Sequence, residues 1–164
     1  MDTRWKPNVT VAAIIEQDGR YLLVEENTTE GLRLNNPAGH LDPAESPALA
    51  CAREALEETT HLFTPTHLIV VYLSRQQRPQ TGEDITYLRL AFAGELGEVQ
   101  AGRTLDSGIV RTVWMTPDEV RASQARHRSP LVLRCIEDHL SGQRHPLGLV
   151  HTDASVSALG PLLT

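Results

Sequence analysis

A helix with a clear start, placed between two groups of strand-like segments, constrains the fold of this chain most. Ser46 can cap a helix and Pro47 suits the first helical position. The residues that follow, up to position 59, are rich in Ala, Leu and Glu, which are strong helix formers. The sequence therefore predicts a helix here, and Leu49, Ala52 and Leu56 have the spacing of one buried face.

Apolar, β-branched segments on both sides of this helix predict strands. Before the helix, Asp18-Gly19 marks the turn of a hairpin, and the polar stretch that follows the hairpin is typical of a loop. After the helix, two longer strands joined by a polar loop precede a shorter strand. The predicted strands are residues 9–15, 21–24, 67–73, 86–96 and 110–115, and the predicted loops are residues 26–36 and 76–84.

Two further helices are expected in the second half of the chain. Thr116 and Glu119 have the spacing of a capping box, and Ser129-Pro130 begins a last helix that runs to about Leu140. This order of elements predicts an α/β domain in which a mixed sheet carries helices on two sides. We assign the domain to residues 1–150 and expect residues 151–164 to form a loosely held C-terminal tail.

The charge and the cysteines limit the partners and the compartment. The formal net charge is −6, so the chain has no general attraction for nucleic acid or anionic membranes. No stretch approaches the ~20 apolar residues of a membrane span, and no signal peptide is evident. Cys51 and Cys135 are far apart and are interpreted as reduced, buried thiols rather than a disulfide. We expect a cytoplasmic protein, either a monomer or a homodimer.

Three glutamates in the predicted helix point to metal chemistry. Glu54, Glu57 and Glu58 lie at i, i+3 and i+4, so they project from one face. Their repulsion costs a few tenths of a kcal/mol per pair, and Mg²⁺, which commonly joins carboxylates to substrate phosphates, would reverse that cost. An acidic helix face is more often simple solvated surface, so these residues alone leave both interpretations open.

The spacing around the glutamates favours the metal interpretation. Gly39 is followed after five residues by Glu45, after seven more by Arg53-Glu54, and then by Glu57-Glu58. This pattern resembles the Nudix box, G-x5-E-x7-R-E-U-x-E-E-x-G-U. The resemblance implies a Nudix-type α/β/α sandwich and an enzyme that hydrolyses phosphoanhydride bonds of small nucleotide or pyrophosphate substrates.

Segments outside the box resemble the NudJ phosphatase branch of this family. That likeness implies hydrolysis of nucleoside tri- and diphosphates and of thiamine-type pyrophosphates. The box does not read the base, so a pyrophosphatase for ADP-ribose or dinucleoside polyphosphates stays open as an alternative. A weakly active nucleotide-binding sensor is a second alternative, which Thr60-His61 in place of the Gly-aliphatic pair of the box supports and the retained carboxylates oppose. The similar segments are VTVAAII at residues 9–15, LLVEE at 22–26, NPAGHLDPAE at 36–45, which overlaps the start of the box, RSPLV at 128–132 and SGQRHPL at 141–147.

The resemblance also implies a role for each residue of the box. Glu57 and Glu58 are expected to be the main ligands of Mg²⁺, with Mn²⁺ as the alternative ion. Glu54 is either a third ligand or the base that deprotonates the attacking water, and the backbone carbonyl of Gly39 is a further ligand. A glycine there also permits close approach of the backbone.

Other charged residues receive supporting roles. Glu45 and Arg53 are expected to form an ion pair that fixes the loop to the helix. Some Nudix enzymes take one more carboxylate from outside the box, and Asp106 is the first candidate. The second candidates for that carboxylate are Glu83 and Asp84.

Substrate contacts outside the box are harder to predict. Arg89 and Arg128 are candidates for phosphate binding, although either one can equally be a surface or ion-pair arginine. Aromatic residues make up only 4% of the chain, which favours a site that binds phosphate more than base. The candidates for stacking on a base are Tyr72, Tyr87 and Trp114.

Two positions depart from the box, because Thr60 and His61 stand where it has Gly and an aliphatic residue. Thr resists the left-handed conformation that ends many helices, by roughly 1–2 kcal/mol. We therefore expect the helix to continue to His61 or further. His61 lies at i+4 from Glu57 and can be a ligand or proton carrier, but packing beside the helix end is favoured because Mg²⁺ prefers oxygen.

Overall fold

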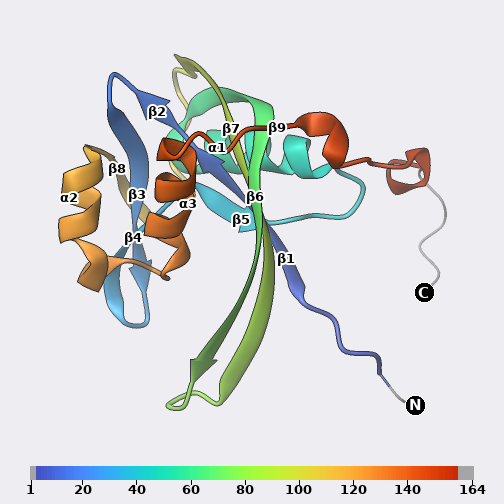
Figure 1. The fold of residues 1–164 in the computed structure, drawn as a ribbon. Helices are drawn as coiled ribbons and strands as arrows, with labels where there is room; N and C mark the ends of the chain where they lie inside the picture. Colours follow the sequence, from blue (N-terminus) through green and yellow to red (C-terminus); the bar gives the residue numbers. More distant parts are fainter. Residues whose placement is uncertain (1–2, 159–164) are drawn as a thin grey trace.

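Strands and helices follow one another along residues 3–158, the part of the chain that the computed structural model describes (Figure 1). The strands are β1 (Asn8–Ile14), β2 (Glu16–Gln17), β3 (Arg20–Thr28), β4 (Gly31–Asn35), β5 (Ala38–His40), β6 (His61–Arg78), β7 (Glu83–Val99), β8 (Ile109–Met115) and β9 (His145–Pro146). The helices are α1 (Pro47–Thr59), α2 (Pro117–Ala122) and α3 (Leu131–Leu140), with short 3-10 helices η1 (Gln124–Arg126), η2 (Leu147–Leu149) and η3 (Ala154–Val156).

These strands form two sheets. The larger sheet has the order β5-β1-β7-β6-β9, and the smaller one is built on β3, which pairs with β2, β4 and β8. In the larger sheet β1 runs parallel to β7, whereas the other neighbouring strands are antiparallel. The α/β class and the mixed sheet that the sequence predicts are confirmed.

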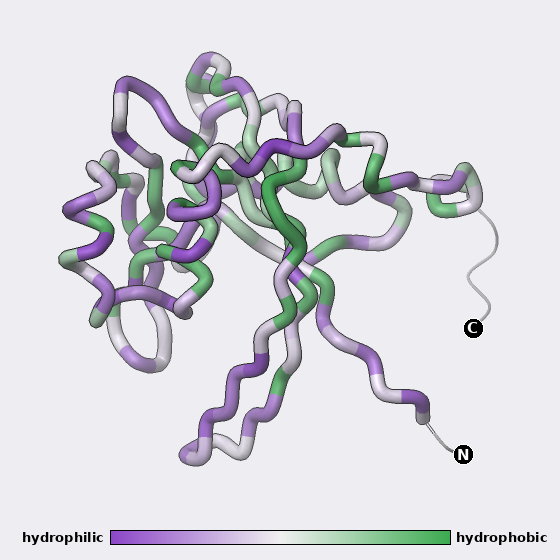
Figure 2. The backbone as a smooth tube through the Cα atoms, viewed as in Figure 1, coloured by the Kyte–Doolittle hydropathy of each residue, from purple (hydrophilic) through white to green (hydrophobic). Residues whose placement is uncertain are grey.

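Each face of the larger sheet packs against a different helix. Side chains alternate along a strand, so Val11 packs with α1 on one face, whereas the next residue, Ala12, packs with α3 on the other. Cys51 lies in the first core and Cys135 in the second, and both are buried free thiols as expected. The predicted α/β/α sandwich is confirmed. Hydrophobic segments gather at the centre of the molecule (Figure 2).

The predicted start signals of the helices are confirmed. The Ser46 hydroxyl accepts a hydrogen bond from the Leu49 amide at 3.2 Å and so caps α1. Thr116 and Glu119 make both halves of a capping box at the start of α2, and α3 ends at Leu140. These signals act over three or four residues, so they are readable without knowledge of the tertiary structure.

The predicted loop over residues 26–36 is wrong. β3 continues to Thr28, and after a turn at residues 29–30 the chain returns as β4, whose first residue, Gly31, has φ 93°. Leu34 in β4 is only 1% exposed, so burial against the core stabilises this strand. The polar residues around Leu34 make the strand hard to recognise in the sequence. Local composition predicts a strand poorly where tertiary packing determines whether the strand forms.

The predicted first hairpin exists, but the strand that pairs with β3 across the turn is β2 and not β1. Asp18 and Gly19 have φ values of 52° and 76°, as a tight two-residue hairpin turn requires. The strands that this turn joins are β2 and β3. β1 instead belongs to the larger sheet, between β5 and β7.

The predicted loop over residues 76–84 is wrong as well, because strands occupy most of it. β6 and β7 form a long hairpin whose far end projects from the body of the protein and is mostly hydrophilic (Figures 1 and 2). Cross-strand ion pairs stabilise this end: Arg75 binds Asp84 at 2.6 Å and Arg78 binds Glu83 at 2.7 Å. The turn itself covers only residues 79–82.

The buried face of α1 also differs from the predicted one. Leu49 is 65% exposed. The buried positions of α1 include Ala55 together with two glutamates, Glu54 and Glu58. Hydrophobic spacing alone misplaced the face because acidic side chains occupy part of it, which burial normally disfavours.

The predicted extension of α1 to His61 is wrong. Thr60 adopts the left-handed conformation, with φ 61°, and its amide donates to the Leu56 carbonyl. His61 then begins β6. A left-handed residue ends the helix as a glycine would, so Thr60 keeps the backbone shape of the box at the cost of local strain.

Replacement of Thr60 by Gly or Asn should therefore stabilise the protein. Both residues enter the left-handed region more readily than Thr, and we expect the free energy of unfolding to rise by about 1 kcal/mol. Urea unfolding monitored by circular dichroism measures this change. Thr60→Val, which keeps the β-branch, is the control, and an equal gain for Val would contradict the explanation.

The C-terminal region continues beyond the last helix of the sandwich. β9 pairs with β6, and Leu147 and Val150 pack against the core beside α1. The loosely held tail at residues 151–164 stays a prediction, and residues 159–164 of it lie outside the described residues. Among residues 3–158, no helix has the length and apolar character needed to cross a membrane.

Candidate active site

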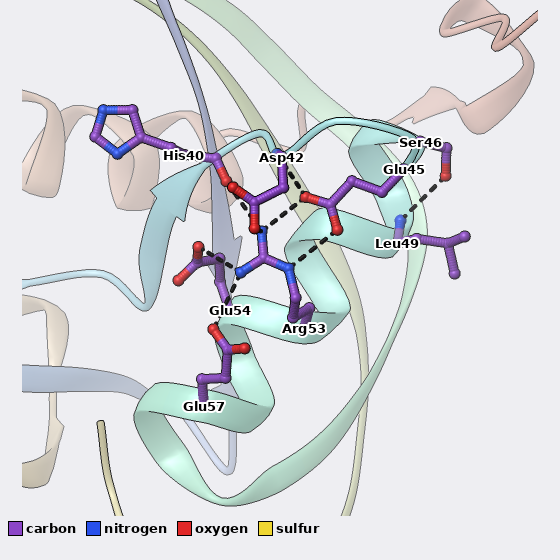
Figure 3. Close-up of polar contacts among 8 residues, drawn as sticks. All are labelled: His40, Asp42, Glu45, Ser46, Leu49, Arg53, Glu54 and Glu57. Atoms are coloured by element: carbon purple, nitrogen blue, oxygen red, sulfur yellow. Dashed lines mark hydrogen bonds and ion pairs between the residues drawn. The ribbon is translucent and has the colours of Figure 1, made fainter. Parts of the chain in front are cut away.

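Arg53 on α1 ties the helix to the loop that follows β5 (Figure 3). Its Nε donates to Glu45 at 3.0 Å and its Nη2 to the other oxygen of the same carboxylate at 2.7 Å. Nη2 also donates to the His40 carbonyl at 3.0 Å. The predicted ion pair of Glu45 and Arg53 is confirmed, and its two parallel bonds fix the loop geometrically. Hydrogen bonding to Arg53 lowers the pKa of Glu45.

The same guanidinium also holds two of the box glutamates. Its Nη1 donates to Glu54 at 2.8 Å and to Glu57 at 3.0 Å (Figure 3). Asp42 lies 3.4 Å from Nη2. One cation therefore faces four carboxylates, Glu45 included. The hydrogen bonds and charges of Glu45 and Glu54 raise the pKa of Arg53. The local balance stays strongly negative, which favours a further cation.

Glu58 is the third box glutamate and is turned toward β5. It is 8% exposed, and one carboxylate oxygen accepts from the Ala38 amide at 3.0 Å. Burial raises the pKa of Glu58 to about 8, and the negative charges of Glu54, Glu26 and Asp106 add to this effect. A bound cation would relieve that unfavourable charge.

Gly39 allows the β5 backbone to lie directly against Glu54. A methyl group at Gly39 would come within 2.1 Å of the carboxyl carbon of Glu54. A side chain at this position would require the Glu54 carboxylate to move, so glycine is what allows the carboxylate to stay where it is. The backbone of β5 and the carboxylate of α1 thus face one space.

The residues of this cluster suit a hard divalent cation. Their donors are carboxylate oxygens and a backbone carbonyl, which Mg²⁺ prefers. Within residues 3–158, no three or more acidic, histidine or cysteine residues are already arranged as a metal site. The reason is visible in Figure 3: Arg53 binds Glu54 and Glu57, so a metal would have to draw these side chains from the guanidinium.

The structure distinguishes among the additional carboxylates that the sequence suggested. The Asp106 amide donates to the Glu57 carbonyl at 3.0 Å, and the charge of Asp106 contributes to the raised pKa of Glu54, after the larger effect of burial. Asp106 therefore lies next to the box. Glu83 and Asp84 are instead engaged in the cross-strand ion pairs at the far end of the β6–β7 hairpin.

A pocket of about 200 Å³ opens beside Gly39. Arg89 and Arg128, the two arginines predicted to bind substrate, both line it, although they come from distant parts of the chain. Arg89 is 9% exposed, whereas Arg128 is more accessible. The remaining lining residues are Thr10, Glu26, Asn35, Ala38, Gly39, His40, Ser74, Gln76, Tyr87, Ser129 and Leu131.

Glu26 and Asn35 are pocket residues that sequence reasoning missed. Both lie in the segment that was misread as a loop. The apolar-polar-apolar order of Leu32, Arg33 and Leu34 was the signal that could have revealed strand β4. Glu26 lies 3.3 Å from the Nε of Arg128.

The candidate stacking residues and His61 fall in different environments. Tyr87 lines the pocket. Tyr72 is part of the core and donates to Asp138 at 2.8 Å, and Trp114 packs against the core beside α1. His61 contacts the Thr59 carbonyl through Nδ1 at 2.9 Å, as packing beside the helix end would require. The described pocket therefore presents a single one of the three aromatics.

The carboxylate cluster and the arginine-lined pocket meet at Gly39. The cluster lies at α1, on one face of the larger sheet, and the pocket lies on the face that carries α3, because Thr10 and Arg89 are paired in register and share the face of Ala12. β5 is the edge strand between them. A polyanion held by cations at the cluster could therefore extend its other end into the pocket.

Replacement of Gly39 by Ala should displace the Glu54 side chain and destabilise the protein. The clash falls on the end of a flexible side chain, so we expect a cost of about 1 kcal/mol, mainly from the lost hydrogen bond between Arg53 and Glu54. The matched control is Gly148→Ala, because nothing lies within 4 Å of a Cβ built at that glycine, and we expect it to change stability by less than ~0.5 kcal/mol. Urea unfolding compares the two variants, and equal stability would contradict the close contact.

The chain is similar to known proteins in both sequence and structure. The NUDIX domain family model matches residues 4–135. The chain is 36% identical to Phosphatase NudJ of Escherichia coli strain K12 over 146 residues, which are 89% of this chain and 92% of the relative. A NUDIX hydrolase structure from Nitrosomonas europaea is 50% identical, with a TM-score of 0.82, and the match covers 90% of this chain and 98% of that one. A second NUDIX hydrolase structure from Nitrosomonas europaea, 19% identical, has a TM-score of 0.67 and covers 87% of this chain and 77% of that one.

Proposed function

Because the chain belongs to the Nudix family and is a hydrolase of phosphoanhydride bonds, we propose that Mg²⁺ is its cofactor and that nucleoside tri- and diphosphates are its substrates. Mn²⁺ is the alternative ion. Thiamine-type pyrophosphates belong to the proposed range, since the chain resembles the NudJ branch. The observation that carries the proposal is the meeting of the glutamate cluster and the arginine-lined pocket at Gly39.

The glutamates of α1 are proposed to hold the cation. Glu57 and Glu58 are its main ligands, the carbonyl of Gly39 adds another oxygen, and Glu54 is a third ligand or the base that takes a proton from the attacking water. When bound, Mg²⁺ neutralises phosphate charge and makes water more acidic. Asp106, which adjoins the helix end, is the proposed additional carboxylate.

Two arginines are proposed to orient the substrate. Arg128 is accessible at the pocket and suits a phosphate oxygen, because a guanidinium offers several donors in a fixed plane. Arg89 lies deeper and contacts the part of the substrate that enters the pocket. Arg53 and Glu45 keep the loop and the helix together, and we regard them as positioning residues.

A weakly active sensor is the alternative that the substitution of the box glycine raised. The conformation of Thr60 argues against it. Thr60 has φ 61°, the left-handed conformation that glycine usually adopts after a helix, so the helix ends where the box requires. This geometry favours an active enzyme. The box is silent on ADP-ribose and dinucleoside polyphosphates, and they belong in the substrate panel described below.

Glu57→Gln should lower kcat/KM by on the order of 100-fold or more, as expected when one electrostatic contact of a transition state is lost. It should also raise the Mg²⁺ concentration needed for half-maximal rate. Phosphate release from nucleoside triphosphates over a Mg²⁺ titration measures both effects. Glu98→Gln, an identical change at an exposed residue of β7, is the control.

Wild-type kinetics in Glu57→Gln would refute the ligand role. The same assay, run on nucleoside tri- and diphosphates, thiamine diphosphate, ADP-ribose and a dinucleoside polyphosphate, identifies the substrate class. Chromatography of the products shows which bond is cleaved. If no member of this panel is hydrolysed with Mg²⁺ or Mn²⁺, the proposed activity is wrong.

A further inference from the structure

Buried polar atoms without a hydrogen-bond partner gather around the pocket. Among the described residues, four of the five such atoms belong to three side chains that line it. The exposed fractions of these residues are 6% for Thr10, 7% for Asn35 and 9% for Arg89. An unsatisfied buried polar group costs roughly 1–3 kcal/mol, so three together indicate a surface built for a ligand. The atoms are Thr10 Oγ1, Asn35 Oδ1, Arg89 Nε and Arg89 Nη1.

Arg89 has no anionic partner among the described residues. The nearby carboxylate, Glu26, is engaged by Arg128. Cys135 also lies close: burial raises the pKa of its thiol, and the charge of Arg89 and a hydrogen bond with it act in the opposite direction. The thiol is a weak acceptor, and Nε and Nη1 of Arg89 have no hydrogen-bond partner. A guanidinium is always charged, and a buried one seeks acceptor atoms. Its donors are therefore available to an acceptor on a ligand.

Asn35 offers a hydrogen-bond acceptor, whereas Arg89 offers donors. Its amide nitrogen donates to Glu26 at 3.5 Å, which leaves the amide oxygen as the free end of the side chain. That oxygen can accept from an N–H group but cannot donate to an acceptor. Thr10 adds a hydroxyl, which does both. Arg89, Asn35 and Thr10 line the same pocket, so its wall carries both donors and an acceptor without a partner.

The size of the pocket limits what can reach these atoms. Sites that enclose an entire small ligand usually measure about 300–1,000 Å³, whereas this one measures about 200 Å³. It can take one ring of a nucleotide, while sugar and phosphates extend outward. Because Gly39 lines the pocket and also contacts Glu54, those phosphates would meet the carboxylate cluster.

We propose that Thr10, Asn35 and Arg89 determine specificity for the head group of the substrate, and that they select a single six-membered heterocycle carrying a hydrogen-bond acceptor next to an amino group. The acceptor faces Arg89 and the amino group faces the Asn35 oxygen. Cytosine has this pattern, whereas guanine is larger and presents a different one. This inference rests on the proposed function, since it names what the same site reads beyond the phosphates.

A mismatched head group is rejected because it leaves these buried groups unpaired. Hydrogen-bonding sites discriminate strongly against ligands that lack the matching group. We therefore expect a preference for CTP over GTP, expressed mainly in KM. Inorganic triphosphate has no head group, so the three residues should not affect its hydrolysis.

Asn35→Leu and Thr10→Val, two changes at residues outside the proposed phosphate-binding and metal-binding sets, test the assignment. Each should lower kcat/KM for CTP by about ten-fold or more, the effect of one lost hydrogen bond to a charged or buried group, while the rate with inorganic triphosphate stays unchanged. The matched control is Asn27→Leu, the same substitution at an exposed position of β3, which should change neither rate. Equal losses on CTP and triphosphate would show that Asn35 and Thr10 do not read the head group, and would overturn the inference.

Two measurements separate this inference from folding and from the proposed function. Asn35→Leu removes an unsatisfied buried oxygen, so its urea midpoint should not fall. Calorimetric titration with cytidine, without metal, should show saturable binding to the wild type, weaker binding of guanosine, and weaker cytidine binding to Asn35→Leu. Absence of cytidine binding by the wild type would overturn the head-group assignment. Failure of the proposed function would instead appear as no hydrolysis of either CTP or triphosphate.

Discussion

The contact of one guanidinium with several carboxylates is the interaction on which the rest of the structure depends. Arg53 joins Glu45 of the loop to Glu54 and Glu57 of α1 (Figure 3). A salt bridge at a surface contributes little by itself, but a two-pronged contact in a partly buried network also fixes geometry. It holds the backbone at Gly39 against the helix and keeps the acidic side chains close together before any cation binds.

The strain in this arrangement identifies what the protein is built to hold. Glu58 is buried with a raised pKa, Thr60 adopts a left-handed conformation, and the Glu54 carboxylate lies where a side chain at Gly39 would be. On the other face of the sheet, Arg89 and Asn35 carry unsatisfied buried atoms. Glu58, Arg89 and Asn35 carry costs in the free protein that would be compensated by a ligand with cations and phosphate at one end and a ring at the other, whereas Thr60 and Gly39 fix the backbone that brings the helix and β5 together. Such costs are common at functional sites.

Features that depend on neighbours along the chain could be predicted from the sequence, and features that depend on tertiary packing could not. The caps at Ser46 and Thr116 and the spacing of the box are local, and the structure has them as predicted. Leu49 follows the correct helical spacing yet is exposed, because Glu54 and Glu58 occupy positions that face the sheet. β4 was missed because Leu34 is buried in the core beside α3, among residues far away in the sequence. The same error concealed Asn35, so the pocket was only half predicted, through Arg89 and Arg128.

The central claim is that carboxylates of one helix, set against Gly39, hold a divalent cation on a substrate whose ring lies in the adjacent pocket. The most direct test is anomalous diffraction from crystals soaked with Mn²⁺ and a non-hydrolysable analogue of CTP. The claim predicts a manganese peak bordered by Glu57, Glu58 and the Gly39 carbonyl, with the ring near Asn35 and Arg89. A manganese peak elsewhere, with these glutamates still bound to Arg53 and the Ala38 amide, would contradict it.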